Sequence, residues 1–241
     1  MSSLYLIRHG QAGTRHNYDA LSDLGRRQAY LLGQHLAGQN VRFKAVFTGG
    51  LNRQKQTAAE VWRAYREAGV EIPDIVSDAH WNEFDMTAVF SEFAPQLSAT
   101  DPRFKHDYEE LLRKLEDADS PDSPIHHAWT DCDTQAMRAW MEDRFPCRTE
   151  SWAAFTERVL SSRASLAAFA PGDAVAVFTS ASPIAIWVAS VFGLTNGHIM
   201  RLAGVMYNSA VTTLRLREND TMLFSFNGVP HLPEPELRSF R

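Results

Sequence analysis

The sequence predicts an α/β protein built on a mostly parallel sheet. Three short apolar runs, at residues 4–7, 45–47 and 174–178, are typical of strands buried on both faces. Each run ends in a polar or glycine-containing turn that leads into a stretch with apolar residues at helical spacing. This alternation of strand and helix is the pattern of a parallel α/β fold.

The first helix is expected within residues 19–38. Ser22 is a candidate N-cap, and Asp23 behind it suits the positive end of a helix. Gly38 is a stop signal. The apolar residues of this helix are Leu24, Leu31, Leu32 and Leu36.

The second apolar run leads to a helix that is expected to end near Gly69 and to carry Arg53 in its first turn. Backbone donors at a helix start are unpaired and favour anions, so Arg53 lies in a region suited to a negative ligand. A third strand is expected at residues 72–76.

Strand signals are absent from residues 86–150, which we expect to form a helical insertion within a single domain of 241 residues. Helices are predicted at residues 104–116 and 128–141, with a Ser/Pro-rich loop at 120–124 between them.

The last third of the chain returns to strand and helix signals. One helix is expected at residues 151–169, and the strand at 174–178 precedes a second helix with Ser182 as N-cap, Pro183 in its first position and its end near Phe192. A terminal pair of strands is expected at 211–216 and 222–226.

Composition bounds the class of protein. A net charge of −5 argues against a general nucleic-acid surface, and the lack of an 18-residue apolar run argues against a membrane span. There is no secretory signal pattern, and the two cysteines make no disulfide framework. We therefore expect free thiols and a cytoplasmic location.

The strongest chemical signal is Arg8-His9-Gly10 at the end of the first strand. Ligands bind at the carboxyl ends of parallel strands. Arg8 offers a planar fork for phosphate or carboxylate, His9 is a candidate nucleophile, acid or base, and Gly10 permits close backbone approach. With Arg53 at the same sheet edge, these residues indicate an anion site with a reactive imidazole.

Two other chemistries fit the sequence poorly. His126-His127, followed by Asp131, Cys132 and Asp133, matches no strong zinc spacing, so no metal ligand or cofactor is predicted. Ser180 and Ser182 do not form the G-x-S-x-G turn of a serine hydrolase.

Taken together, four segments resemble the histidine phosphatase superfamily, which includes the cofactor-dependent phosphoglycerate mutases. The first is Leu-Ile-Arg-His-Gly-Gln at residues 6–11, and the second is Leu21-Ser22 with Gly25 and Gln28-Ala29. The third, residues 51–58, resembles the segment that supplies the family's second phosphate-binding arginine. The fourth is Glu83, where the family often places its proton donor.

This resemblance implies a three-layer α/β/α sandwich with the helical insertion over the site, as in phosphoglycerate mutase-like proteins. It also implies a metal-independent phosphomonoester hydrolase that acts on a phosphorylated small molecule. His9 would become a phosphohistidine, Arg8 and Arg53 would hold the phosphoryl oxygens, and Glu83 would protonate the leaving group.

One position departs from the family pattern. The second histidine that follows the late core strand is replaced by Ser180, which can donate a hydrogen bond but brings no charge. The alternatives are therefore mutase-type phosphoryl transfer and a non-catalytic protein that binds phosphorylated ligands. His231 resembles a separate C-terminal feature of the family. The sequence does not indicate the substrate or the oligomeric state.

Overall fold

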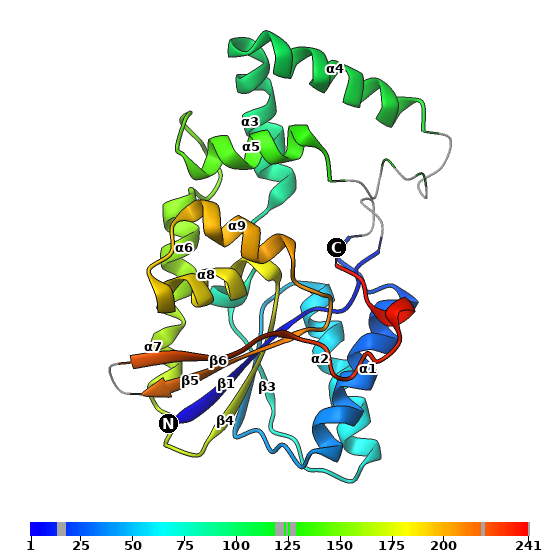
Figure 1. Ribbon diagram of the computed structural model, residues 1–241, viewed down its shortest axis with the longest axis vertical. Helices are drawn as coiled ribbons and strands as arrows, with labels where there is room; N and C mark the ends of the chain where they lie inside the picture. The colour runs from blue at the N-terminus through cyan, green and yellow to red at the C-terminus, as the bar shows by residue number, and fades with distance from the viewer. Residues whose placement is uncertain (14–17, 119–122, 124, 126–128, 218–219, 241) are drawn as a thin grey trace. The chain divides into compact units, whose positions relative to one another are not determined.

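The computed structural model describes residues 1–13, 18–118, 123, 125, 129–217 and 220–240. Its chain forms a six-stranded sheet with the strand order β3-β2-β4-β1-β5-β6 (Figure 1). The strands are β1 (Ser2–Arg8), β2 (Ala45–Thr48), β3 (Ile75–Ser77), β4 (Ala174–Thr179), β5 (Val211–Arg217) and β6 (Asp220–Gly228).

Helices occupy most of the remaining described chain. They are α1 (Asp23–Gly38), α2 (Asn52–Glu67), α3 (Met86–Thr100), α4 (Pro102–Glu116), α5 (Asp131–Met141), α6 (Trp152–Ser161), α7 (Arg163–Leu166), α8 (Ala181–Phe192) and α9 (Asn196–Gly204), with 3-10 turns η2 (Ala79–Trp81) and η4 (Pro235–Leu237).

The sheet combines a parallel part with an antiparallel edge. Strand β4 pairs in parallel with β1 and β2, and β2 pairs in parallel with β3. The terminal strands β5 and β6 add an antiparallel edge beside β1. Helices α1 and α2 cover one face of the sheet, and α8 and α9 lie on the other (Figure 1). The predicted α/β sandwich with a mostly parallel sheet is therefore confirmed.

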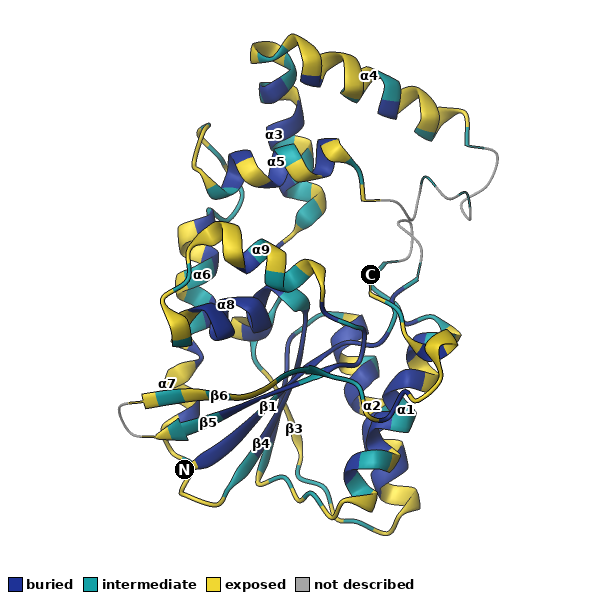
Figure 2. Cartoon of the chain, viewed as in Figure 1, coloured by how far each residue is buried: buried dark blue, intermediate teal, exposed yellow. Residues whose placement is uncertain are grey.

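The core of this sandwich consists of the apolar residues that suggested the strands. Strand β1 is buried along nearly its whole length, as is β4 (Figure 2). One core cluster joins the strands to α1 and α2 through residues such as Ile7, Val46, Leu32, Val61 and Phe178. Burial of these side chains supplies the main force that holds the two helices on the sheet.

Two predicted elements need corrected boundaries. Helix α8 begins at Ala181 with Ser180 as N-cap, rather than with Ser182 as N-cap. Pro183 is tolerated inside the first turn, because an N–H there would have no intrahelical partner. The third strand, β3, is also shorter than predicted.

The single helix predicted at 151–169 is divided into α6 and α7 at Ser162. The Ser162 hydroxyl donates to the carbonyl of Val159 at 2.6 Å and accepts from the indole of Trp187 at 3.3 Å. Such side-chain bonds compete with the helix ladder. Helix α9 was not predicted at all, since its first turn contains the weak helix formers Asn196 and Gly197.

The chain divides into two compact units. The first comprises Met1–Gly13, Tyr18–Glu83 and Arg158–Arg241 and contains the sheet, whereas the second contains Phe84–Glu157. The predicted helical insertion at 86–150 falls within the second unit. Apart from residue 123, the predicted loop at 120–124 lies outside the described residues, as does the predicted helix start at residue 128.

The second unit has its own aromatic core. The rings of Phe84 and Trp140 lie 4.8 Å apart, and those of Trp140 and Trp152 lie 5.2 Å apart, with Phe155 against all three. Helix α3 packs against both α4 and α5. The position of this unit over the site stays a prediction. Within the described chain, no helix is both long and apolar enough to cross a membrane.

Candidate active site

The pairing of β1 with β4 brings His9 and Ser180 to the same edge of the sheet. Arg8 lies opposite Thr179, and the His9 backbone N–H donates to the Thr179 carbonyl at 2.9 Å. His9 and Ser180 are the next residues on their respective strands. Strand β2 ends at the same edge, and the loop after it leads into α2, which carries Arg53 in its first turn.

Gly10 brings the backbone after β1 close to helices α1 and α2. Its N–H donates to the Thr57 hydroxyl at 3.0 Å, and that hydroxyl donates to the carbonyl of Arg53 at 2.7 Å. A Cβ atom on Gly10 would lie 2.3 Å from the Gly25 carbonyl oxygen. Only glycine fits here, and the two hydrogen bonds of the Thr57 hydroxyl connect the backbone beside His9 to that of Arg53.

His9 is buried and its tautomer is defined by the backbone. Its Nδ1 lies 2.8 Å from the Gly10 carbonyl oxygen, which can only accept, so Nδ1 carries the proton. Nε2 is then left with its lone pair. Burial lowers the pKa of His9 well below its usual value, and the positive charges of Arg53 and Arg8 lower it further. The site therefore holds a neutral imidazole between two cations.

Arg8 and Arg53 are both buried charged residues. Arg8 donates to the Met206 carbonyl. Burial lowers the pKa of Arg8. Electrostatic interactions with Tyr18 and Glu83, and a hydrogen bond with Tyr18, raise that pKa and so offset part of the shift. The Nε–H groups of both arginines are buried and meet no acceptor in the part of the chain that the structure describes. Because unpaired buried donors are costly, these groups point to an anionic ligand.

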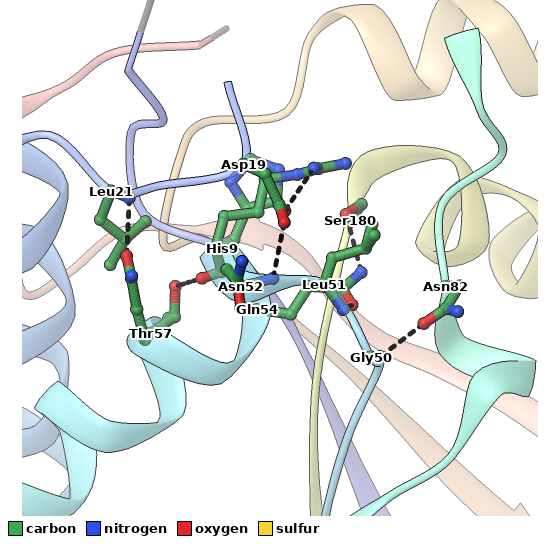
Figure 3. Close-up of polar contacts among 12 residues, drawn as sticks. His9, Asp19, Leu21, Gly50, Leu51, Asn52, Gln54, Thr57, Asn82 and Ser180 are labelled. Atoms are coloured by element: carbon green, nitrogen blue, oxygen red, sulfur yellow. Dashed lines mark hydrogen bonds and ion pairs between the residues drawn. The ribbon is translucent and has the colours of Figure 1, made fainter. Parts of the chain in front are cut away.

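Asp19 interacts with Arg53 and with the start of helix α2. Its carboxylate lies 3.1 Å from Arg53 Nη1 and accepts from the backbone N–H of Asn52 at 3.2 Å (Figure 3). The ring of Tyr18 lies 4.9 Å from the Arg53 guanidinium carbon. A carboxylate held by an arginine and a helix N-terminus occupies the kind of position that a phosphate prefers.

Glu83 follows η2 and is held from two directions. Its Oε2 accepts from the Ser182 backbone N–H at 3.2 Å, at the start of α8. Before it in the chain, the carbonyls of Ala79 and Asn82 accept from the Arg158 guanidinium at 2.8 and 3.2 Å. These contacts fix the Glu83 backbone and place its carboxylate on the same side of the fold as Arg8, whose pKa it affects.

Ser180 is buried beside Gln54. Its hydroxyl oxygen accepts from Gln54 Nε2 at 2.9 Å (Figure 3). His231 is not part of this pair, because its Nε2 lies 2.8 Å from the hydroxyl of Ser209. The Ser209 backbone N–H in turn donates to the His9 carbonyl at 3.1 Å, so Ser209 contacts both histidines, His231 through its side chain and His9 through its backbone.

The structure thus brings Arg8, His9 and Arg53 together, with Glu83 and Ser180 placed by α8. Sequence reasoning missed Asp19, Gln54 and Thr57. Gln54 and Thr57 lie within the segment at 51–58 that suggested Arg53, so its other polar residues were a usable signal. Asp19 offered no such signal, because its contact with Arg53 joins two separate segments.

No group of three His, Cys, Asp or Glu side chains within the described residues lies close enough together to hold a metal ion. His126 and His127 lie outside the described residues. The described site instead combines a neutral imidazole, two guanidinium groups and a carboxylate, which are groups able to act as a nucleophile, to stabilise an anion and to carry a proton.

Two solved structures resemble the whole fold. One is YhfR of Bacillus stearothermophilus, with a TM-score of 0.63 and 18% identity, covering 96% of this chain and 100% of that one. The other is phosphoglycerate mutase from Bacillus anthracis, with a TM-score of 0.59 and 17% identity, covering 96% and 95%. At these identities the likeness concerns the fold.

Among curated proteins, the serine/threonine-protein phosphatase Pgam5, mitochondrial, of Caenorhabditis elegans is 24% identical over 132 residues, which are 50% of this chain and 43% of that protein. The chain therefore spans less than half the length of this relative. The sequence profile of the histidine phosphatase superfamily (branch 1) matches residues 4–120 and 125–228. Since that match covers nearly the whole chain, the protein belongs to the histidine phosphatase superfamily.

Proposed function

We propose that this protein is a phosphomonoester hydrolase that forms a phosphohistidine on His9. The observation that carries the proposal is the neutral, buried His9 imidazole between Arg8 and Arg53, whose Nε–H groups meet no acceptor among the described residues. A phosphate ester would supply oxygens for those donors and a phosphorus atom for Nε2. The names of the relatives, which include a phosphatase, support the same reaction class.

In the first step, the lone pair of His9 Nε2 attacks phosphorus and the bond to the ester oxygen breaks. The leaving oxygen takes a proton from the Glu83 carboxyl group. Arg8 and Arg53 stabilise the charge on the oxygens that are not transferred, and the Ser180 hydroxyl donates to one of them. The Gly10 carbonyl keeps the Nδ1 proton in place as the imidazole becomes covalently bound.

In the second step, the Glu83 carboxylate takes a proton from water, whose oxygen attacks phosphorus. The bond between phosphorus and Nε2 breaks, releasing inorganic phosphate and restoring both His9 and the Glu83 carboxyl group. In both steps the guanidinium groups of Arg8 and Arg53 stabilise the negative charge on the phosphoryl oxygens. The mechanism therefore needs no metal ion.

We further propose that residues 86–150 set the choice of phosphorylated small molecule, since loops and insertions around a site carry specificity while the sheet carries the chemistry. The cytoplasmic location stays a prediction. A non-catalytic role remains the second candidate, because Ser180 places a neutral hydroxyl where the family pattern has a histidine.

The test is hydrolysis of an aryl phosphate after dialysis against a chelator. We expect turnover to persist in EDTA and to vanish in His9→Ala, while His198→Ala, at an exposed histidine, behaves as wild type. Activity that is lost in EDTA and restored by a divalent ion would contradict metal independence. Binding of phosphate without turnover would favour the non-catalytic alternative.

A further inference from the structure

The Ser180 hydroxyl stands at a helix start but does not cap the helix. An N-cap serine normally accepts from the backbone N–H of the second or third helical residue. In α8 the second residue is Ser182, whose N–H donates to Glu83, and the third is Pro183, which has no N–H. Within the described chain, Ser180 makes no capping bond, so its hydroxyl is available for another role.

The Gln54 side chain determines how that hydroxyl is used. Gln54 is fully buried, and its Oε1 accepts from the backbone N–H of Leu51 at 3.3 Å. Its Nε2 donates to the Trp81 carbonyl at 3.2 Å. The same Nε2 donates to Ser180 Oγ at 2.9 Å (Figure 3). An N–H cannot accept and a carbonyl cannot donate, so these two backbone partners allow one orientation of the amide.

In that orientation the amide nitrogen faces Ser180, and Ser180 must accept. Its own proton is therefore not used by Gln54 and stays available as a donor. Ser180 is almost completely buried, and it directly follows Thr179, whose carbonyl accepts from the backbone N–H of His9 at 2.9 Å. The Ser180 hydroxyl is thus carried at the same end of the paired strands as the proposed nucleophile.

We propose that Gln54 is a positioning residue, which holds the Ser180 hydroxyl as a hydrogen-bond donor to the phosphoryl group during transfer to and from His9. This inference rests on the proposed phosphatase function. A lone hydroxyl can rotate toward any nearby acceptor, and a bond accepted from Gln54 limits that rotation by keeping the proton on the side of the oxygen away from the amide. The Gln54–Ser180 pair then supplies a fixed donor at the position where the family pattern has a histidine.

The first test reverses the bond. In Gln54→Glu the side chain can still accept from the Leu51 N–H, but an ionised carboxylate cannot donate, so Ser180 must donate its proton to Glu instead. We expect the single-turnover rate of phosphoryl transfer to fall by about tenfold to a hundredfold, as expected for loss of one hydrogen bond to a charged group. Wild-type rates in Gln54→Glu would overturn the inference.

A matched control lies two residues further along the same helix. Gln56 Oε1 accepts from the Leu21 backbone N–H at 2.8 Å, a bond that a carboxylate also makes. Gln56→Glu therefore adds the same charge to α2 while keeping the hydrogen bond from Leu21. We expect this variant to transfer phosphate at close to the wild-type rate. An equal loss in both variants would assign the effect to charge and overturn the inference.

The second test is a double-mutant cycle with the neutral variant Gln54→Met, which also serves if Gln54→Glu does not fold. Gln54→Met and Ser180→Ala should each slow transfer, and the double variant should be no slower than the slower single variant, because both act through one hydroxyl. Effects that multiply would overturn the inference. An inactive wild type would instead reject the proposed function itself. If the wild type is active and Gln54→Met transfers phosphate at the wild-type rate, only the role of Gln54 is rejected.

Discussion

The Asp19 carboxylate holds two groups that a phosphate would use, namely Arg53 Nη1 and the Asn52 backbone N–H. Its side chain is 47% exposed, whereas that of Arg53 is 8% exposed. Asp19 can therefore move away from Arg53 into water, while Arg53 stays in place. The ion pair supplies Arg53 with a partner in the free protein and would compete with a phosphate for it.

Asp19→Asn should consequently tighten product inhibition by inorganic phosphate. A partly exposed ion pair is worth a few tenths to about 1 kcal/mol, so the inhibition constant should fall by about twofold to fivefold. The measurement is steady-state inhibition by phosphate, with Asp23→Asn, which removes the same charge from the exposed start of α1, as control. An unchanged or larger inhibition constant in Asp19→Asn would show that the two anions do not compete.

Single side chains were predictable where local sequence determines their position. Arg8 and His9 lie at the end of a buried strand, and Arg53 lies in the first turn of a helix. The local sequence pattern predicted both the end of that strand and the start of that helix. Asp19 could not be found this way, and for Gln54 the sequence indicated the segment at 51–58 but not the contact with Ser180. Their partners, Arg53 and Ser180, are 34 and 126 positions away, and only the folded chain brings them together.

Helices α1 and α2 pack so closely at Gly33 that a side chain at this position would force them apart. A Cβ atom on Gly33 would lie 2.5 Å from the Val61 carbonyl oxygen and 2.7 Å from the Cβ atom of Ala64. Both atoms belong to helix α2, whose backbone cannot shift locally. Since α2 also carries Arg53, this packing contributes to the position of the site.

Gly33→Ala should therefore destabilise the protein by about 1–3 kcal/mol, the usual range for overpacking a core. Gly38→Ala is the matched control, because a Cβ atom there meets nothing within 4 Å. The control should leave stability unchanged or raise it by up to about 1 kcal/mol through helix propensity. Urea unfolding measures both. A Gly33→Ala protein as stable as the control would mean that the two helices can separate without cost.

Elements were predictable when their apolar pattern was strong, as in β1, β4 and α1. Their ends were less so. Helix α8 starts after Ser180, and α6 and α7 are separated at Ser162; the hydroxyls of both serines accept a hydrogen bond from a distant segment, Ser180 from Gln54 and Ser162 from Trp187. Propensity alone does not reveal which partner a serine will find.

The folded molecule as a whole buries neutral histidines, which makes its stability depend on pH. Burial lowers the pKa of His231 from 6.5 to about 3, with a further contribution from His35. Between these values the unfolded chain binds a proton that the folded chain does not. Stability therefore falls as the pH decreases below 6.5, with a slope of up to about 1.4 kcal/mol per pH unit for this group. His9 acts in the same direction.

His231→Gln should remove this share of the acid sensitivity. The difference in unfolding free energy between pH 7 and pH 5 should shrink by about 2 kcal/mol relative to wild type, whatever the substitution costs at pH 7. His198→Gln, at an exposed position, should keep the wild-type difference. If His231→Gln retains the full acid sensitivity in urea unfolding at the two pH values, the neutral state of His231 does not contribute to it.

The central claim is that His9 accepts the phosphoryl group covalently. Its most direct test is to mix enzyme and an excess of aryl phosphate, quench in alkali within one turnover, and locate phosphate on peptides by mass spectrometry. We expect phosphate on the peptide that contains His9, stable in alkali, lost in acid and absent from His9→Ala. Turnover without a phosphorylated His9, or phosphate on any other residue at the rate of turnover, would contradict the claim.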